Sequence, residues 1–192
     1  METMQRIGLF GGSFDPVHLG HLLVAQAARE ELDLGRLFFV PAAQSPFKPD
    51  ARPSPAPERL RLLRLALAGQ DGCEIDEQEI QRGGMSYTID TVRAYARRLP
   101  KAQLFYLIGA DHLPQLPKWR AADELARLVE FVAIPRPWRA AQPFPAPFRG
   151  RWLAGFPLGI SSSQIRARVK AGLPITSLVP PAVAETILNN GL

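Results

Sequence analysis

The sequence predicts an α/β fold in which a doubly wound, mostly parallel sheet carries helices on both faces. Short uninterrupted apolar runs alternate with longer segments of helical periodicity along the chain, and this alternation is typical of βαβ units. The first apolar run also leads through two glycines straight into a helical segment. Buried strands joined by helices indicate a Rossmann-like sheet, so we expect ligands at the carboxyl ends of the strands.

In the amino-terminal half, the apolar run at 6–10 predicts the first strand, and the periodicity of 22–34 predicts the helix after it. Residues 37–40 are aromatic and β-branched, which favours a second strand that ends at Pro41. Prolines at 41, 46, 49, 53, 55 and 57 are too dense for a helix or a central strand, so 41–57 is predicted to be a loop. Two helices at 58–67 and 88–99 and a short strand at 73–77 complete this half.

In the carboxy-terminal half, residues 104–108 form an apolar run before Gly109 and predict a buried strand. A helix at 123–128 and a strand at 131–134 continue the alternation. Prolines crowd 135–150, which is predicted to be a second irregular loop over the edge of the sheet. The last elements are predicted to be a serine-capped helix at 162–171 and a helix that opens at Pro180 or Pro181 and ends near Asn190.

Composition predicts one domain over residues 1–192. A chain of 192 residues with 46% hydrophobic content is long enough for one compact core. The single cysteine, Cys73, allows neither an intramolecular disulfide nor a cysteine-rich metal site, which fits a reducing compartment. The sequence shows no secretory pattern and no apolar run of the ~18 residues that a membrane span needs, so we expect a cytoplasmic protein without a membrane partner.

The formal charge of +5 suggests an anionic partner, which is a nucleic acid, an acidic membrane or a phosphate-rich small substrate. Charge alone does not choose among the three. Many arginines stand at helical spacing among leucines and alanines, which predicts that they solvate helix faces. These arginines are Arg59, Arg61, Arg64, Arg93, Arg97 and Arg98.

The stretch GGSFDPVHLGH, residues 11–21, joins the first predicted strand to the first helix. Gly11 and Gly12 let backbone amides approach a bulky anion, and the helix that follows presents unpaired N–H groups to phosphate oxygens. His18 and His21 are three residues apart, so both imidazoles can project from one helix face toward the same phosphates. The stretch fits neither GxGxxG nor GxxxxGK[ST], which disfavours hydride transfer and a Walker-type phosphate loop.

These residues resemble the HxGH signature of the nucleotidyltransferase superfamily. A second segment, ISSSQIR at 160–166, is similar to the ISSTxIR motif of the adenylyltransferases in that superfamily, with Ser163 in place of threonine. In this segment Ser162 can cap a helix while Ser161 and backbone amides meet phosphate. Arg166, one turn later, can reach the β- and γ-phosphates with a forked cation.

Further motifs resemble the nicotinate mononucleotide adenylyltransferase family over essentially the whole chain. SPFK at 45–48 resembles that family's PPHK loop, and SYT at 86–88, IGAD at 108–111, LPKW at 116–119 and RP at 136–137 match its motifs. Two positions depart from the pattern: Phe47 stands where the family has histidine, and Arg120 stands where tyrosine is common.

The resemblance implies a role for each matched position. Residues implied to bind ATP are Gly11, Gly12, Ser13, Phe14, Gly109, Asp111, Arg136, Ser161 and Ser162. Residues implied to bind the mononucleotide are Lys48, Thr88, Ile89, Trp119 and Arg120. Trp119 would stack on the pyridine, Ile89 and Arg120 would contribute their backbone amides, and Lys48 would bind the phosphate. Residues implied to be catalytic are His18, His21 and Arg166.

The implied reaction transfers AMP from ATP to nicotinate mononucleotide and releases pyrophosphate. Mg²⁺ would arrive with ATP, held by substrate oxygens and water, so no protein metal ligand is assigned. Amide donors at a helix start suit the anionic carboxylate of nicotinate better than the neutral carboxamide of nicotinamide. The degree of that preference and the oligomeric state stay open.

Three other functions share some of these sequence features. Phosphopantetheine adenylyltransferase shares the HxGH and late serine signatures but lacks the SYT, IGAD and LPKW set. A basic nucleic-acid-binding module fits the charge, yet the aromatic residues are not interleaved with lysines, so no nucleic-acid partner is expected. A nucleotide sensor without catalysis is disfavoured because both histidines and Arg166 are retained.

Overall fold

A computed structural model describes residues 4–47, 53–137, 140–156 and 158–190. Within these residues, six strands form one sheet in the order β3-β2-β1-β4-β5-β6, and every neighbouring pair is parallel. The strands are β1 (Arg6–Gly12), β2 (Arg36–Pro41), β3 (Cys73–Ile75), β4 (Gln103–Gly109), β5 (Glu130–Ile134) and β6 (Gly150–Trp152). This confirms the predicted doubly wound α/β class.

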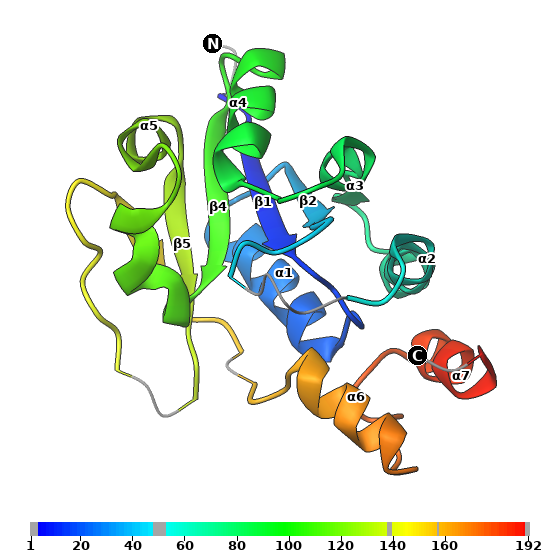
Figure 1. Ribbon diagram of the computed structural model, residues 1–192. Coiled ribbons are helices and arrows are strands. Elements are labelled where there is room, and N and C mark those ends of the chain that lie inside the picture. Colours follow the sequence, from blue (N-terminus) through cyan, green and yellow to red (C-terminus); the bar gives the residue numbers. More distant parts are fainter. Residues whose placement is uncertain (1–3, 48–52, 138–139, 157, 191–192) are drawn as a thin grey trace.

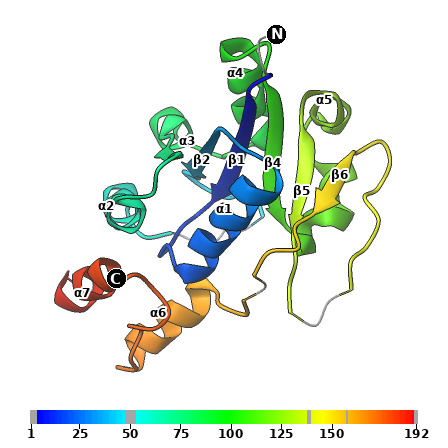
Figure 2. The ribbon, with the colours of Figure 1, turned by 180° about the vertical axis from the view of Figure 1, so that it is seen from behind.

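Helices cover both faces of the sheet, as Figures 1 and 2 show from opposite sides. Those that share one apolar core cluster are α1 (Leu19–Glu31), α2 (Ala56–Leu67), α6 (Ser162–Lys170) and α7 (Pro181–Asn190). The second cluster contains α4 (Thr88–Arg98), the 3₁₀ helix η1 (Ala110–Lys118) and α5 (Ala122–Leu128). A short helix, α3 (Gln78–Arg82), precedes α4. Among the described residues, every helix is too short or too polar to cross a membrane.

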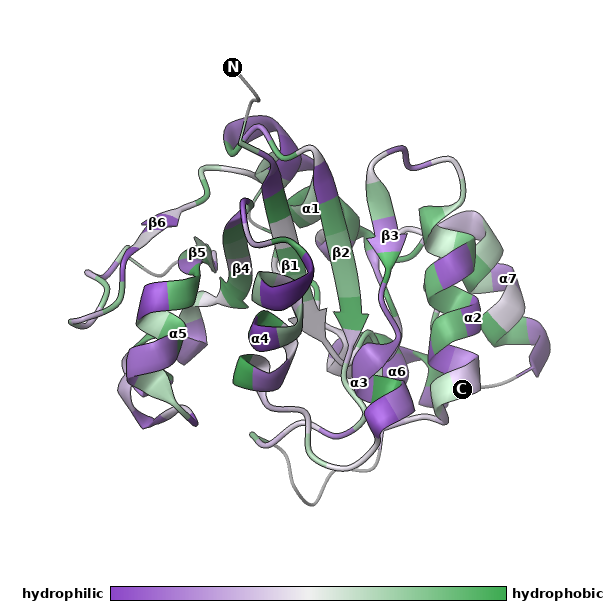
Figure 3. Cartoon of the chain, turned by 90° about the horizontal axis from the view of Figure 1, so that it is seen from above, coloured by the Kyte–Doolittle hydropathy of each residue, from purple (hydrophilic) through white to green (hydrophobic). Residues whose placement is uncertain are grey.

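Hydropathy explains this layering. Figure 3 shows β2 as hydrophobic along most of its length, whereas α4 and α5 carry hydrophobic and hydrophilic residues together. Successive β1 residues enter different clusters, since Ile7 and Leu9 pack with α4 and Phe10 packs with α1. A strand that is buried on both faces reads as a continuous apolar run, which is why the inner strands were predictable.

The predicted 41–57 loop is wrong at both ends. Pro41 is the last residue of β2, and α2 begins at Ala56 with Pro57 in its first turn. The first helical turn tolerates proline because its N–H would lack an intrahelical partner anyway. The first helix begins at Leu19 rather than 22 and ends at Glu31 rather than 34.

Three elements were not predicted at all: α3, η1 and β6. The first and last are too short to show a period. The 3₁₀ helix contains Pro114 and Pro117, which interrupt the apolar spacing by which a helix is recognised.

One of the arginines predicted to solvate helix faces lies in the interior. Arg59 is 2% exposed, whereas Arg61, Arg64, Arg97 and Arg98 are exposed and Arg93 is partly buried. The prediction is therefore wrong for Arg59, because helical spacing does not reveal which arginine finds carbonyl partners inside the fold.

Candidate active site

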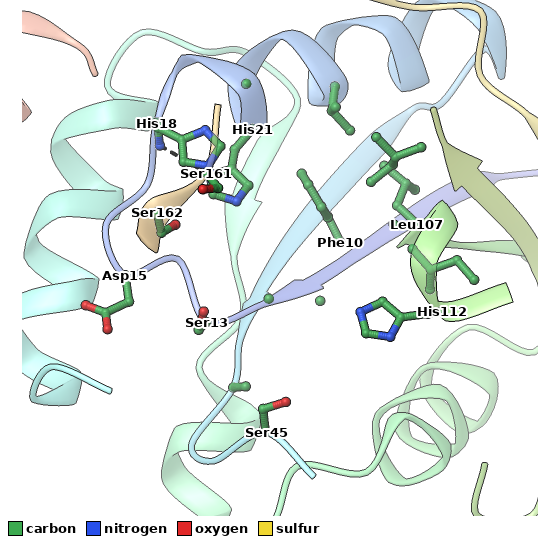
Figure 4. A pocket seen from close by; sticks show the side chains of 18 of the residues that line it. Phe10, Ser13, Asp15, His18, His21, Ser45, Leu107, His112, Ser161 and Ser162 are labelled. Carbon is green, nitrogen blue, oxygen red and sulfur yellow. Dashed lines mark hydrogen bonds between the residues drawn. The ribbon is translucent and has the colours of Figure 1, made fainter. Parts of the chain in front are cut away.

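A cavity of about 400 Å³ opens at the carboxyl ends of β1 and β4, where the strand order reverses. Ligands of doubly wound sheets bind at such a point. Figure 4 shows side chains from both ends of the chain around it. The predicted site residues that line it are Gly11, Gly12, Ser13, His18, His21, Thr88, Gly109, Trp119, Arg136, Ser161, Ser162 and Arg166.

The two histidines stand at the start of α1. His18 is the residue before the helix, and its backbone N–H donates to Nδ1 of His21 at 3.2 Å. The imidazole rings stack with centroids 3.7 Å apart (Figure 4). Because Nδ1 of His21 accepts a hydrogen bond, the neutral ring carries its proton on Nε2, which can donate to a ligand. The prediction that both imidazoles reach one place is confirmed.

Both histidines are neutral at pH 7. Burial lowers the pKa of His18 from 6.5 to about 4, and the nearby charge of Arg136 adds to the effect. The pKa of His21 is lowered well below 6.5 by burial, then by His18 and Arg136. The cationic charge of the site therefore comes from the guanidinium groups, and the imidazoles act as neutral hydrogen-bonding groups.

Gly11 lies against Tyr106, which belongs to the second apolar cluster. A Cβ at Gly11 would overlap the hydroxyl of Tyr106, which is buried and lies 3.3 Å from Oγ1 of Thr88. A residue larger than glycine would therefore have to displace the side chain of Tyr106. The predicted contact of Phe14 with ATP is not supported for its side chain, since Phe14 is 1% exposed and packs against Phe10 and His21.

The start of α6 meets the start of α1 (Figure 4). Ser161, not Ser162, caps α6, because its Oγ accepts from the amide of Gln164 at 3.3 Å. Ser162 instead donates from Oγ to the carbonyl of Pro16 at 2.9 Å. The predicted cap was therefore one residue too late, since a run of three consecutive serines does not show by itself which one is the last in extended conformation.

Arg166 also reaches the loop before α1. Its Nη1 donates to the carbonyl of Asp15 at 2.5 Å and lies 3.7 Å from the Asp15 carboxylate. The guanidinium lines the same cavity as the two histidines. The late helix and the first helix therefore meet at one site, as the two sequence motifs predicted.

The opposite end of the cavity is aromatic. Trp119 packs against the core ring of Phe131 and lies 5.4 Å from the ring of Phe47. Its Nε1 is buried without a hydrogen-bond partner among the described residues. The ring of His112 lies 4.8 Å from that of Phe47.

Several predicted contacts lie away from the cavity lining. The side chain of Ile89 is fully buried in the core and the guanidinium of Arg120 lies over the ring of Tyr87, which leaves their backbone amides as the predicted donors. Asp111 forms an ion pair with Arg136 at 3.3 Å, so it orients a cation that lines the cavity. Lys48 lies outside the described residues.

Sequence reasoning assigned no binding or catalytic role to seven polar residues of the cavity wall: Asp15, Ser45, Glu79, Ser86, Tyr106, His112 and Ser163. His112 could have been found, because the chain has only three histidines and the other two stand in the HxGH motif. Glu79 carried no signal, since its helix was not predicted. Among the described residues no group of three or more His, Cys, Asp or Glu side chains could hold a metal ion.

The sequence matches a known protein family and named relatives over most of its length. Residues 9–168 match the cytidylyltransferase-like family model. The probable nicotinate-nucleotide adenylyltransferase of Gemmatimonas aurantiaca is 43% identical over 197 residues, which cover 97% of this chain and 92% of the relative. The nicotinate-nucleotide adenylyltransferase of Bacillus subtilis is 37% identical over 191 residues, 98% of each chain.

A solved structure supports the fold. Plasmodium falciparum nicotinic acid mononucleotide adenylyltransferase complexed with NaAD superimposes with a TM-score of 0.83, covering 98% of this chain and 97% of that one. The identity is 18%, so this likeness shows the fold alone.

Proposed function

The chain belongs to the cytidylyltransferase-like family, and we propose that it is a nicotinate-nucleotide adenylyltransferase acting as a single domain in NAD biosynthesis. It transfers AMP from ATP to nicotinate mononucleotide, giving nicotinate adenine dinucleotide and pyrophosphate. Relatives that carry this activity in their names align over nearly the full chain. The observation that carries the proposal is the meeting of the histidine pair and Arg166 in one cavity at the reversal of strand order.

The reaction joins two anions. The phosphate oxygen of the mononucleotide attacks the α-phosphorus of ATP, a new P–O bond forms, and the bond to the bridging oxygen breaks so that its electron pair leaves with pyrophosphate. The attacking phosphate is already ionised at neutral pH, so no general base is needed. Repulsion and alignment set the barrier, and they are overcome by positioned donors and in-line placement.

The site supplies such donors. In the proposal, Nε2–H of His21 and the neutral imidazole of His18 contact the phosphates, including the α-phosphoryl group as charge redistributes. Arg166 steadies the departing pyrophosphate, and Arg136, oriented by Asp111, adds positive charge beside the histidines. The glycine loop and the start of α6 offer backbone N–H groups to the same anions.

The aromatic end of the cavity suits the mononucleotide. Trp119 offers a ring face and an indole N–H, and Thr88 lies at the start of α4, where amide donors favour an anionic carboxylate. Lys48 is proposed to bind the mononucleotide phosphate.

Mg²⁺ accompanies ATP in this proposal. In the part of the chain that the structure describes, no group of three or more His, Cys, Asp or Glu side chains could hold a metal ion, and Oδ2 of Asp15 in the cavity wall accepts from the amide of Ser54 at 3.1 Å and lies 3.7 Å from Arg166. Phosphate oxygens and water are therefore the proposed ligands, as Mg²⁺ prefers. When bound, the ion neutralises charge on the polyphosphate.

The test measures pyrophosphate release with ATP and each of three acceptors: nicotinate mononucleotide, nicotinamide mononucleotide and phosphopantetheine. We expect the highest kcat/KM with nicotinate mononucleotide. H18A is expected to lower kcat by ~10²-fold, the order observed when one transition-state donor is removed. Faster transfer to phosphopantetheine would refute the proposed acceptor, and an unchanged kcat in H18A would refute the role of His18.

A further inference from the structure

Two buried side chains of opposite charge lie beside the cavity and take no part in the proposed chemistry. Arg59 on α2 is 2% exposed, and Glu79 on α3 is 3% exposed. A buried charge is costly unless it is hydrogen-bonded. The partners of each side chain therefore indicate which parts of the structure it holds in place.

Arg59 joins the two loops that follow β1 and β2. Its Nη1 donates to the carbonyls of Ser13 and Ala42 at 2.8 and 2.9 Å, and its Nε donates to the carbonyl of Ser54 at 2.9 Å. The amide of Ala42 in turn donates to the carbonyl of Gly12 at 2.9 Å. Because the donors of a guanidinium point in fixed directions, Arg59 sets the position of both loops at once.

Glu79 approaches the second of these loops from the other side. It accepts from Oγ1 of Thr91 at 2.5 Å and is hydrogen-bonded by the side chain of Ser86. Oγ of Ser86 accepts from the amide of Ala43 at 2.9 Å. Since that hydroxyl accepts from an amide, its own proton is the one directed to Glu79.

The two sets of contacts meet at a single peptide unit. The Ala42 carbonyl and the Ala43 amide belong to the same planar group and point in opposite directions. Arg59 holds the carbonyl, and Ser86 with Glu79 holds the amide. Residues after this unit, among them Ser45 and Phe47, line the cavity together with Thr88 and the glycine loop.

We propose that Arg59 and Glu79 are a pair of positioning residues, which hold the Ala42–Ala43 peptide unit between them and set the spacing of the two substrate-binding loops. This rests on the proposed function, because it assigns one loop to ATP and the other to the mononucleotide. Glu79 positions only the loop after β2, which is assigned to the mononucleotide. Arg59 positions that loop and, through the carbonyl of Ser13, also the loop after β1, which is assigned to ATP.

Single variants test the division. E79Q keeps the shape of the side chain without its charge. R59K keeps the positive charge but removes the guanidinium and its fixed set of donors. E79Q is expected to raise the KM for nicotinate mononucleotide by ~10-fold, with kcat within ~3-fold and the KM for ATP unchanged. R59K is expected to raise both KM values. Unchanged KM values in both folded variants would overturn the proposal.

Double variants test whether the pair acts as a unit. Residues of one hydrogen-bond network are non-additive, whereas independent sites multiply their effects. The R59K/E79Q variant is therefore expected to raise the mononucleotide KM by ~10-fold, as each single variant does, and not by ~100-fold. S86A is expected to match E79Q, and adding E79Q to S86A is expected to change nothing further. Multiplied effects in both double variants would show two separate structural roles.

Matched controls separate positioning from loss of fold. R61Q on α2 changes an exposed arginine, and E77Q, before α3, changes an acid that pairs with Arg64. Both are expected to leave the two KM values unchanged. Thermal melting of every variant checks that it is folded. If R59K does not fold, the KM values of S86A, E79Q and the S86A/E79Q double variant decide the proposal.

Failure of the proposed function is recognised separately, by the absence of AMP transfer in the unaltered chain. In that case calorimetric titration with ATP replaces the KM values. R59K is then expected to weaken ATP binding and E79Q to leave it unchanged. Equal ATP affinity in R59K and the unaltered chain would overturn the positioning role of Arg59.

Discussion

Lowering the pH should destabilise the chain through His18 in particular. Its pKa is 6.5 in an unfolded chain and about 4 in the folded one, chiefly because the ring is buried. As the pH falls through 6.5, the unfolded chain binds a proton that the folded chain does not bind until about pH 4. Stability is therefore fully present above pH 6.5 and is lost between pH 6.5 and 4.

The size of the loss follows from the difference in pKa. A difference of about 2.5 pH units at about 1.4 kcal/mol per unit corresponds to about 3 kcal/mol below pH 4, of which about 2 kcal/mol is already lost at pH 5. That is a substantial part of the ~5–15 kcal/mol by which native domains are stable.

The assay compares urea unfolding of the unaltered chain and H18N between pH 7 and pH 4.5. Asparagine does not titrate and is among the best residues to precede a helix, so the start of α1 should persist. The remaining titrating groups are common to both proteins, so the difference between their stability curves reports the titration of His18 together with its electrostatic effect on the neighbouring His21. We expect the curves to diverge by about 2 kcal/mol at pH 5. Parallel curves would refute a buried, neutral His18.

Three further outcomes are expected. G11A should destabilise the fold by about 1–3 kcal/mol, because its Cβ would overlap the Tyr106 hydroxyl; adding Y106F should restore part of the lost melting temperature, and no restoration would contradict the steric explanation. R36Q should change unfolding free energy by less than about 1 kcal/mol, since Arg36 and Glu74 form an ion pair with both side chains over 40% exposed; a larger loss in urea titration would count against this. W119L should raise the KM for the mononucleotide by ~10-fold or more with the KM for ATP unchanged, because base–aromatic stacking contributes about 1–3 kcal/mol; equal changes in both KM values would place the indole elsewhere.

The sequence was most informative where the local pattern and the final environment agree. The inner strands were predictable because burial on both faces produces uninterrupted apolar runs. The approach of His18, His21 and Arg166 was predictable because each stands at or near a helix start that follows a recognisable motif.

The remaining features depend on contacts between distant segments. Arg59 has the same helical spacing as the exposed Arg61, and only the fold brings three carbonyls to it. Ser161 and Ser162 are chemically alike, and the packing of α6 against Pro16 decides which one caps the helix. Phe14 was assigned to ATP from its place in the motif, whereas its left-handed backbone turns the ring into the core.

The hydrogen bonds from α6 to the loop before α1 span 146 and 151 residues of sequence. During synthesis on a ribosome, β1 and its glycine loop emerge early, but the guanidinium that faces them is added only when most of the chain exists. Contacts of such long range form late, because a large loop must close before they can be made. A nascent chain thus displays one half of the proposed phosphate-binding site for most of its translation and gains the other half near the end.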